Sequence, residues 1–85
     1  MSARAPLPAG LETPAVVIDL DIVERNIATM ATAMRDRGVA LRPHAKTHKS
    51  VRMARLQLDT GASGITVGTL GEGEVMADAG IVDLF

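Results

Sequence analysis

The stretch GITVGTLGE, residues 64–72, decides the fold because it places a short strand directly before the start of a helix. Its first five residues are a β-branched run between two glycines, which is typical of a short strand. Thr69 is followed three residues later by Glu72, and this spacing predicts a capping box that begins a helix. We expect this helix to continue through Ala79.

The same order, a short strand and then a helix, recurs on both sides of that stretch. Upstream, Asp21 and Glu24 have the spacing of a capping box with Asp21 as the N-cap, and Gly38 has the position of a glycine that follows a helix. Strands that alternate with helices through short connections form βαβ units, so we expect the strands to be parallel. The predicted strands are residues 15–19, 39–46, 64–68 and 81–85, and the other two predicted helices follow Asp21 as far as Asp36 and span residues 50–60.

Parallel βαβ units build either a doubly wound open sheet or a (β/α)8 barrel, and hydrophobic periodicity alone does not choose between them. Three and a half such units in 85 residues correspond to about a third of a ~250-residue barrel. The sequence also stops at Phe85 inside a strand-like run that no turn signal follows. We therefore expect residues 14–85 to be the front part of a longer α/β domain, and residues 1–13 to be a flexible N-terminal arm.

The composition excludes several classes of protein. The 85 residues are 47% hydrophobic and 22% charged, as in a globular domain, and nine Lys and Arg against ten Asp and Glu give a net charge of −1. This balance argues against a general nucleic-acid binder or membrane-surface binder. The absence of cysteine excludes disulfides and thiolate metal sites. Because the sequence has no bilayer-spanning apolar run and no signal-peptide core, we expect a cytoplasmic protein.

The string RPHAKTHK, residues 42–49, contains both lysines of the chain. It lies in a basic segment, residues 38–58, that has no acidic residue and five cations: Arg42, Lys46, Lys49, Arg52 and Arg55. Such a segment favours an anion, and a phosphate group is a reasonable candidate. The alternative for Arg52 and Arg55 is that they belong to a solvated helix face.

Within this string, Arg42, His44 and Lys46 alternate, so a strand would point all three to one face. At the carboxyl end of a barrel strand that face lines the mouth where active sites lie, whereas the alternative is a face that is simply exposed to solvent. A lysine there, partly desolvated among other cations, would lose its proton more readily and could form a Schiff base with a carbonyl. Lys46 fits this role better than Lys49, which follows the predicted strand.

Two other motifs predict little chemistry. His44 and His48 are four residues apart, which suits a metal ion only on a helix, so we predict no metal site within this chain. Gly68, Gly71 and Gly73 match neither the P-loop nor the dinucleotide-binding fingerprint. Turn and capping roles explain these glycines better than an anion site at the helix start.

Several strings of the sequence carry a family resemblance: TPAVVIDLD at 13–21, Asn26, RPHAKTHK at 42–49, GTLGE at 68–72 and AGI at 79–81. Together they resemble the start of a D-threonine aldolase or a D-serine dehydratase, which are fold-type III pyridoxal phosphate enzymes. The resemblance implies an α/β fold, the N-terminal portion of a (β/α)8 TIM-type barrel of the alanine racemase-like kind, incomplete in this chain. It also implies that residues 15–19 belong with a C-terminal β-domain and that the strand ending at Lys46 is the first of the barrel.

The resemblance further implies the site and the reaction. Lys46 would form the Schiff base with pyridoxal 5'-phosphate, and Arg42 and His44 would lie beside or beneath the cofactor. The reaction would be retro-aldol cleavage of a D-β-hydroxy-α-amino acid to glycine and an aldehyde, assisted by a divalent metal whose ligands lie outside this chain. By the same resemblance we expect a homodimer at full length, with a small-molecule D-amino acid as substrate, and no activity from these 85 residues alone.

Three other functions stay open. A dehydratase acting on D-serine or 3-hydroxyaspartate would use the same lysine but break the bond to the β-hydroxyl. A non-catalytic protein could bind pyridoxal phosphate without turnover. A plain α/β module could bind an anionic partner through the basic segment, and its binding would survive Lys46→Arg, whereas a Schiff base would not because a guanidinium cannot form one.

Overall fold

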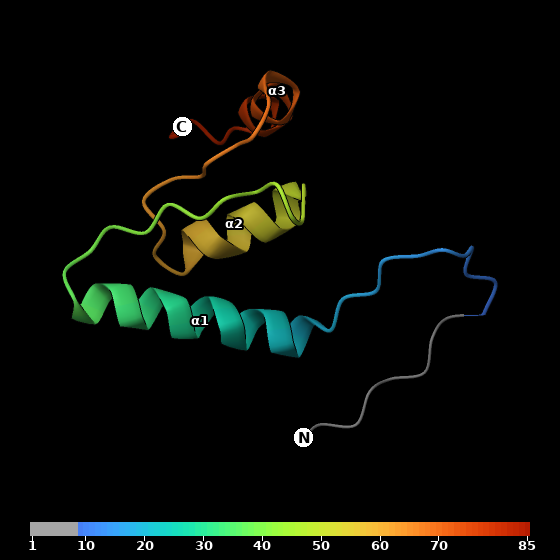
Figure 1. Ribbon diagram of the computed structural model, residues 1–85, viewed down its shortest axis with the longest axis horizontal. Helices are drawn as coiled ribbons and strands as arrows, with labels where there is room; N and C mark the ends of the chain where they lie inside the picture. Colours follow the sequence, from blue (N-terminus) through green and yellow to red (C-terminus); the bar gives the residue numbers. More distant parts are fainter. Residues whose placement is uncertain (1–8) are drawn as a thin grey trace.

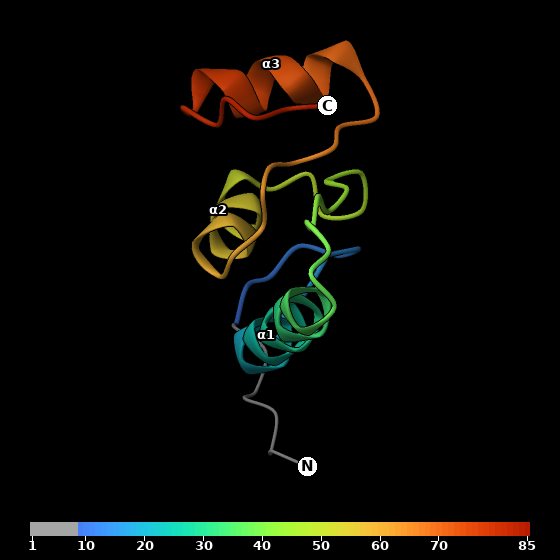
Figure 2. The same ribbon diagram turned by 90° about the vertical axis from the view of Figure 1, so that its left-hand side faces the viewer.

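The computed structural model describes residues 9–85, so most of the predicted arm at 1–13 lies outside the described residues. Within these described residues three helices follow one another: α1 (Leu20–Asp36), α2 (Val51–Asp59) and α3 (Leu70–Asp78). They are stacked in chain order, with extended segments running between them (Figures 1 and 2). The three helices predicted from the sequence are therefore confirmed, and the ends of α2 and α3 lie within one residue of the predicted ends.

The first helix begins two residues earlier than the sequence predicts. The carboxylate of Asp19 accepts hydrogen bonds from the backbone N–H groups of Asp21 and Ile22, at 3.0 and 3.3 Å. Asp19 has the extended backbone of an N-cap, with φ −87° and ψ 107°, whereas Asp21 is already helical. The prediction of Asp21 as the cap was therefore wrong, because Asp19, two residues earlier, caps the free N–H groups of Asp21 and Ile22 and leaves Asp21 inside the helix. The end of α1 is as predicted, with Gly38 in the left-handed region at φ 67°.

The third helix begins at the predicted cap, Thr69, and the second begins after Ser50, which the sequence predicted as its first residue and which is its N-cap. The Ser50 hydroxyl accepts from the Met53 N–H at 3.2 Å, and the Thr69 hydroxyl accepts from the Glu72 N–H at 3.1 Å. In turn, one carboxylate oxygen of Glu72 accepts a hydrogen bond from the Gly68 N–H at 3.2 Å. The predicted capping role of the residues around Thr69 is thus confirmed, since the Thr69 hydroxyl and the Glu72 carboxylate both accept hydrogen bonds from backbone N–H groups at the start of α3.

Three extended segments, residues 41–45, 63–67 and 81–85, lie side by side in parallel. The first pair is joined by backbone bonds from Thr66 N–H to Pro43 C=O at 2.8 Å and from Ala45 N–H to Thr66 C=O at 2.8 Å. Equivalent bonds join Ile65 to the third segment, so residues 63–67 are bonded on both sides. The parallel order is confirmed. The pairing is shorter than predicted, because only the isolated bridges His44–Thr66 and Ile65–Leu84 form rather than full strands.

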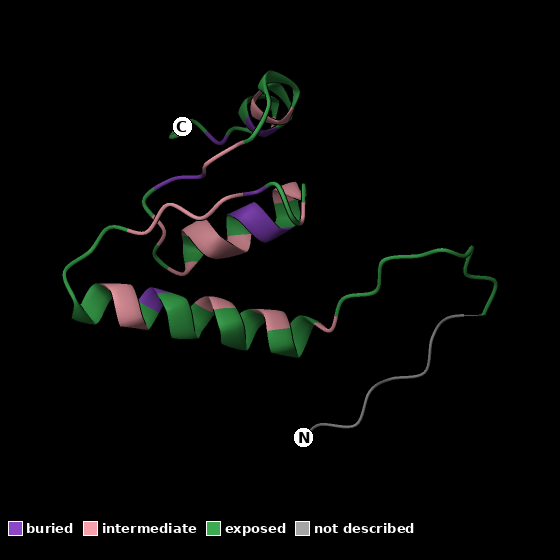
Figure 3. Cartoon of the chain, in the orientation of Figure 1, coloured by how far each residue is buried: buried purple, intermediate pink, exposed green. Residues whose placement is uncertain are grey.

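The core lies between these segments and the two shorter helices. Ile65 is completely buried, and Ala45 and Ala54 are also completely buried, so that α2 can approach the first segment closely. Figure 3 shows the buried positions along α2, along the extended segments and beside α3, with little burial on α1. The buried cluster consists of Ala45, Ala54, Ile65, Met76 and Ile81, and Val51, Leu58, Val67 and Leu84 pack against it.

The predicted strand at residues 15–19 does not form within residues 9–85. Val16 is 93% exposed and Val17 is 60% exposed. No backbone hydrogen bond joins residues 15–18 to another segment of the described chain. A strand needs a neighbour to satisfy its N–H and C=O groups, and none lies beside this segment in the described part of the chain. Separately, none of the helices within residues 9–85 is both long and apolar enough to cross a bilayer.

Candidate functional site

Lys46 opens a turn of residues 46–48 that directly follows the first extended segment. The turn is closed by a hydrogen bond from the Lys49 N–H to the Ala45 C=O at 2.7 Å. Ala45 is completely buried in the core, and Lys49 has a left-handed backbone with φ 51°. The backbone of Lys46 therefore lies at the carboxyl edge of the parallel segments, and the buried Ala45 and the closed turn fix its position.

The Lys46 side chain is exposed, so the predicted partial desolvation of this lysine is wrong for the described chain. Among residues 9–85 no carboxylate forms an ion pair with its ammonium group, because Asp83 forms the one salt bridge there and Arg42 is its partner. The Lys46 side chain is exposed because its residue lies in the turn, outside the core that contains Ala45. The amine is thus open to a ligand.

His44 lies beside Lys46 and holds its backbone. The His44 Nδ1 accepts a hydrogen bond from the Lys46 N–H at 3.0 Å, so in the neutral ring Nε2 carries the proton. The ring also lies against the next segment, where its Cε1 would be 3.4 Å from a Cβ placed on Gly68. Gly68 therefore leaves the space that the imidazole needs at this edge.

Arg42 crosses the middle segment to reach the third. Its Nη1 lies 2.7 Å from Oδ1 of Asp83 and donates to the Asp83 C=O at 3.2 Å. The crossing passes over the buried Gly64, where a Cβ would lie 2.6 Å from the Asp83 C=O oxygen and would also collide with the Arg42 guanidinium. Gly64 and Gly68 are four residues apart, so Arg42 and His44 share one face, as their alternation predicts.

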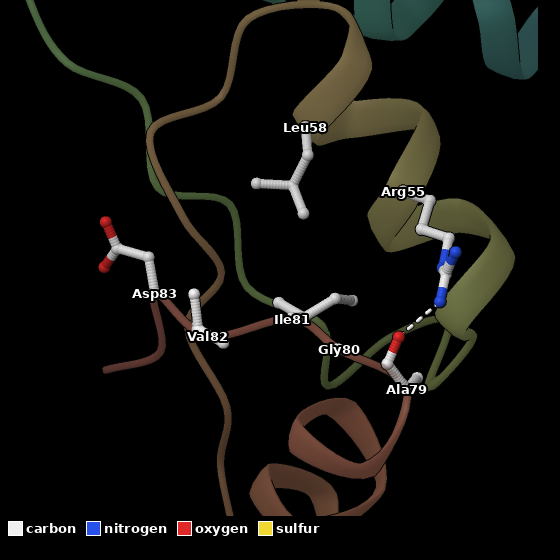
Figure 4. Close-up of a pocket in the computed structure, with 7 residues that line it drawn as sticks. All are labelled: Arg55, Leu58, Ala79, Gly80, Ile81, Val82 and Asp83. Atoms are coloured by element: carbon white, nitrogen blue, oxygen red, sulfur yellow. Dashed lines mark hydrogen bonds between the residues drawn. The ribbon is translucent and has the colours of Figure 1, made fainter.

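The cations of the basic segment do not converge on one point. Arg42 is paired with Asp83, and Arg55 donates to the Ala79 C=O. Figure 4 shows Arg55 and Leu58 of α2 facing residues 79–83 across a hollow of about 290 Å³, which Lys46 does not line. The predicted accumulation of positive charge is therefore divided between two places in the fold.

Metal ligands do not gather within residues 9–85, where no group of three or more His, Asp or Glu side chains is placed to hold a metal ion. His44 uses Nδ1 for the Lys46 N–H, and His48 uses Nδ1 for the Ser50 N–H at 2.9 Å. That the metal ligands of the whole protein lie outside this chain stays a prediction.

A family model for the alanine racemase N-terminal domain matches residues 18–84, which is most of the chain. The chain belongs to this family. The family interpretation made from the sequence strings is confirmed, and so is the fold class, the N-terminal portion of an alanine racemase-like domain.

Relatives within the family carry two kinds of name. The chain is 57% identical over 74 residues to a D-threo-3-hydroxyaspartate dehydratase from Delftia sp. (strain HT23), which covers 87% of this chain and 20% of the relative. The solved structure of that dehydratase superposes with a TM-score of 0.84 over 88% of this chain and 20% of its own. The structure of a D-threonine aldolase from Filomicrobium marinum has a TM-score of 0.83 at 46% identity, over 87% of this chain and 20% of its own. This chain spans about a fifth of the length of these relatives.

Sequence reasoning missed several contacts of the site. It did not identify Gly64 and Asp83 as the partners that receive Arg42, because the Arg and the Asp are 41 residues apart and no local pattern joins them. For His48 it considered only the role of a metal ligand, and it rejected that role. The one signal available was the shared spacing: the Nδ1 of His44 and the Nδ1 of His48 each accept a hydrogen bond from the backbone N–H two residues later.

Proposed function

We propose that this chain forms the cofactor-bearing part of a pyridoxal phosphate-dependent lyase, with Lys46 as the residue that holds the cofactor. The single observation that supports this most is the setting of Lys46. Its backbone is fixed by His44 and by the turn from Ala45, while its amine is exposed at the carboxyl edge of parallel segments. Active sites of parallel barrels lie at that edge.

The residues around Lys46 are compatible with the cofactor. An aldehyde needs a primary amine that it can reach, and the Lys46 Nζ is such an amine. Beside it, Gly68 has no side chain, and the His44 Cε1 would lie 3.4 Å from a Cβ placed there. We propose His44 as the side chain next to the cofactor. Arg42, whose guanidinium is held by Asp83, supports the segment from its other end.

The chemistry of the reaction divides between cofactor and protein. When bound, pyridoxal phosphate supplies an electron sink for the negative charge that develops on the substrate Cα. Lys46 binds the cofactor through Nζ, and His44 holds the Lys46 backbone through Nδ1. With Nδ1 engaged in this way, the neutral His44 ring keeps its Nε2–H as a donor.

The first candidate reaction is retro-aldol cleavage of a D-β-hydroxy-α-amino acid to glycine and an aldehyde. A relative named 3-hydroxy-D-aspartate aldolase, from Paracoccus denitrificans, is 39% identical over 75 residues. The second candidate is dehydration of D-serine or 3-hydroxyaspartate, which the 57% identity to the Delftia dehydratase favours. In both, the substrate is a small D-configured amino acid, and a divalent metal held by residues outside this chain belongs to the proposal, as does a homodimer at full length.

The test of the proposal is a chemical label on Lys46. The protein at its full natural length is purified with pyridoxal phosphate, reduced with borohydride, digested and examined by mass spectrometry. We expect the reduced cofactor on the peptide that contains Lys46, and its loss in Lys46→Arg together with a fall in turnover on the order of a thousandfold or more. Lys49→Arg is the matched control and should keep the label.

The outcomes separate the candidate functions. A label that is absent, or that lies on another lysine, contradicts the proposal and favours a plain anion-binding module. With the label on Lys46, glycine and an aldehyde indicate the aldolase, and a keto acid with ammonia indicates the dehydratase. A labelled protein without turnover on any D-amino acid is a non-catalytic cofactor carrier.

A further inference from the structure

Both nitrogens of the His48 ring are engaged at the end of the turn that carries Lys46. The ring is half-buried, its Nδ1 accepts from the Ser50 N–H at 2.9 Å, and its Nε2 lies 3.2 Å from Oε1 of Gln57. An accepting Nδ1 requires the proton on Nε2, and Nε2–H is the donor that the Gln57 oxygen needs. One neutral tautomer therefore satisfies both bonds.

These two bonds connect the turn to two points of α2. Ser50 is the N-cap of the helix, and Gln57 lies near its other end, seven residues further along the chain. The ring thus braces the turn against the helix that contributes Ala54 to the core. Without His48, residues 46–48 would be held only through the bond between Lys49 and Ala45 and through His44.

The backbone of Lys49 shows why a brace is needed. A lysine in the left-handed region, here at φ 51°, is less favourable than one with the usual helical or extended backbone. Such a conformation persists only where neighbouring contacts fix it, and such positions cluster at functional sites. His48 directly precedes Lys49, and its ring fixes the residue that directly follows, Ser50.

We propose that His48 is a positioning residue, which fixes the turn onto α2 and thereby sets the direction in which the Lys46 amine leaves the carboxyl edge. The inference rests on the proposed function of Lys46. It assigns His48 no contact with substrate or cofactor. Its action on Lys46 passes through the backbone of residues 46–50.

Three variants separate the two bonds of the ring. His48→Ala removes both bonds. His48→Asn keeps an acceptor for the Ser50 N–H, because the Asn Oδ1 takes the place of Nδ1, but it cannot reach Gln57. Gln57→Met removes the other partner at similar volume. Asp59→Asn, an exposed change at the end of the same helix, is the matched control.

The experiment has two readouts on the protein at its full natural length. The first is hydrogen exchange of the Ser50 and Lys46 amides in the cofactor-free protein, which involves no activity. The second is the rate at which added pyridoxal phosphate becomes fixed to Lys46, measured by borohydride reduction and mass spectrometry. We expect His48→Ala to speed the exchange and slow the labelling by about tenfold each. His48→Asn should recover most of both effects, Gln57→Met should change both by a few-fold, and Asp59→Asn should match the parent protein.

The failures of the two hypotheses are distinguishable. Parent protein without a label on Lys46 overturns the proposed function, and the positioning role with it. Parent protein labelled on Lys46, with His48→Ala matching it in both readouts, overturns the positioning role alone. If His48→Ala does not fold, Gln57→Met decides by the same two readouts, and parent-like values in both readouts contradict the inference.

Discussion

The two parts of the chain on either side of Val39 differ in burial, although their local sequence signals are alike. In residues 9–38 Ala31 is the one buried hydrophobic residue, whereas residues 39–85 contain the whole buried cluster around Ile65. The β-branched run at 16–18 is exposed, and the less apolar run at 42–45 is bonded to its neighbour. Strand propensity therefore decides less than the presence of a parallel neighbour at the right distance along the chain.

The helices repeat this contrast. α1 has 17 residues and is capped at both ends, yet it buries a single side chain, Ala31. α2 has nine residues and buries two, Met53 and Ala54. Local hydrogen bonds and caps are enough to shape α1, but the packing that stabilises a fold is concentrated between α2, α3 and the extended segments (Figure 3).

The largest expected effect on stability compares two isoleucines, one from each part of the chain. Ile65→Ala should lower the free energy of unfolding of the full-length protein by about 2–5 kcal/mol, because it removes a completely buried side chain and leaves a cavity. Ile18→Ala, at a side chain that is 44% exposed, should cost less than about 1 kcal/mol. Urea unfolding monitored by circular dichroism measures both. Equal losses would break the comparison, since they would mean that residues beyond this chain bury Ile18.

A second prediction concerns two glycines of the better-packed part. Gly64→Ala should lower stability by about 1–3 kcal/mol, because its Cβ would overlap the Asp83 backbone and the Arg42 guanidinium. Gly71→Ala meets only the Thr69 hydroxyl, at 3.9 Å, and should raise stability by up to about 1 kcal/mol through helix propensity. The midpoints of urea unfolding measure both changes. A tolerated Gly64→Ala would contradict the close crossing of Arg42 over the middle segment.

The smallest effect tests the start of α1 in the less packed part. Asp19→Ala removes the N-cap and should cost about 1 kcal/mol. Asp21→Ala removes only a charge in the first turn and should cost about 0.5 kcal/mol or less. Hydrogen exchange of the Ile22 amide, together with urea unfolding, compares the two. A larger loss for Asp21→Ala would restore the cap that the sequence predicted.

The sequence predicted those elements that local chemistry controls. Ser50, Thr69 and Gly38 end or begin helices through their own side chain or backbone, so the patterns around them were sufficient. The strand at 15–19 could not be judged in this way, because its formation depends on a neighbour elsewhere in space. The sequence also did not show that Asp19 rather than Asp21 is the N-cap, since both are acidic residues near the same helix start.

The site divides along the same line. The alternation of Arg42, His44 and Lys46 predicted their common face, and the contacts of Arg42 and His44 with Gly64 and Gly68 agree with it. For Lys46 the sequence left a partly desolvated and a solvent-exposed side chain as alternatives, and the turn of residues 46–48 decides for exposure. The ion pair between Arg42 and Asp83 could not be predicted either, because the two residues lie on segments that only the fold brings together.

The spacing of the paired segments has a consequence for synthesis on the ribosome. Ala45 bonds to Thr66 and Ile65 bonds to Phe85, so each pairing joins residues about twenty positions apart. At about 5–20 residues per second, each partner emerges roughly one to four seconds after the segment that awaits it. Loop closure takes about microseconds or less, so every strand–helix unit has time to dock before the next one appears. Residues 16–18 find no such partner among the next units described, so this apolar run stays uncovered while those units dock.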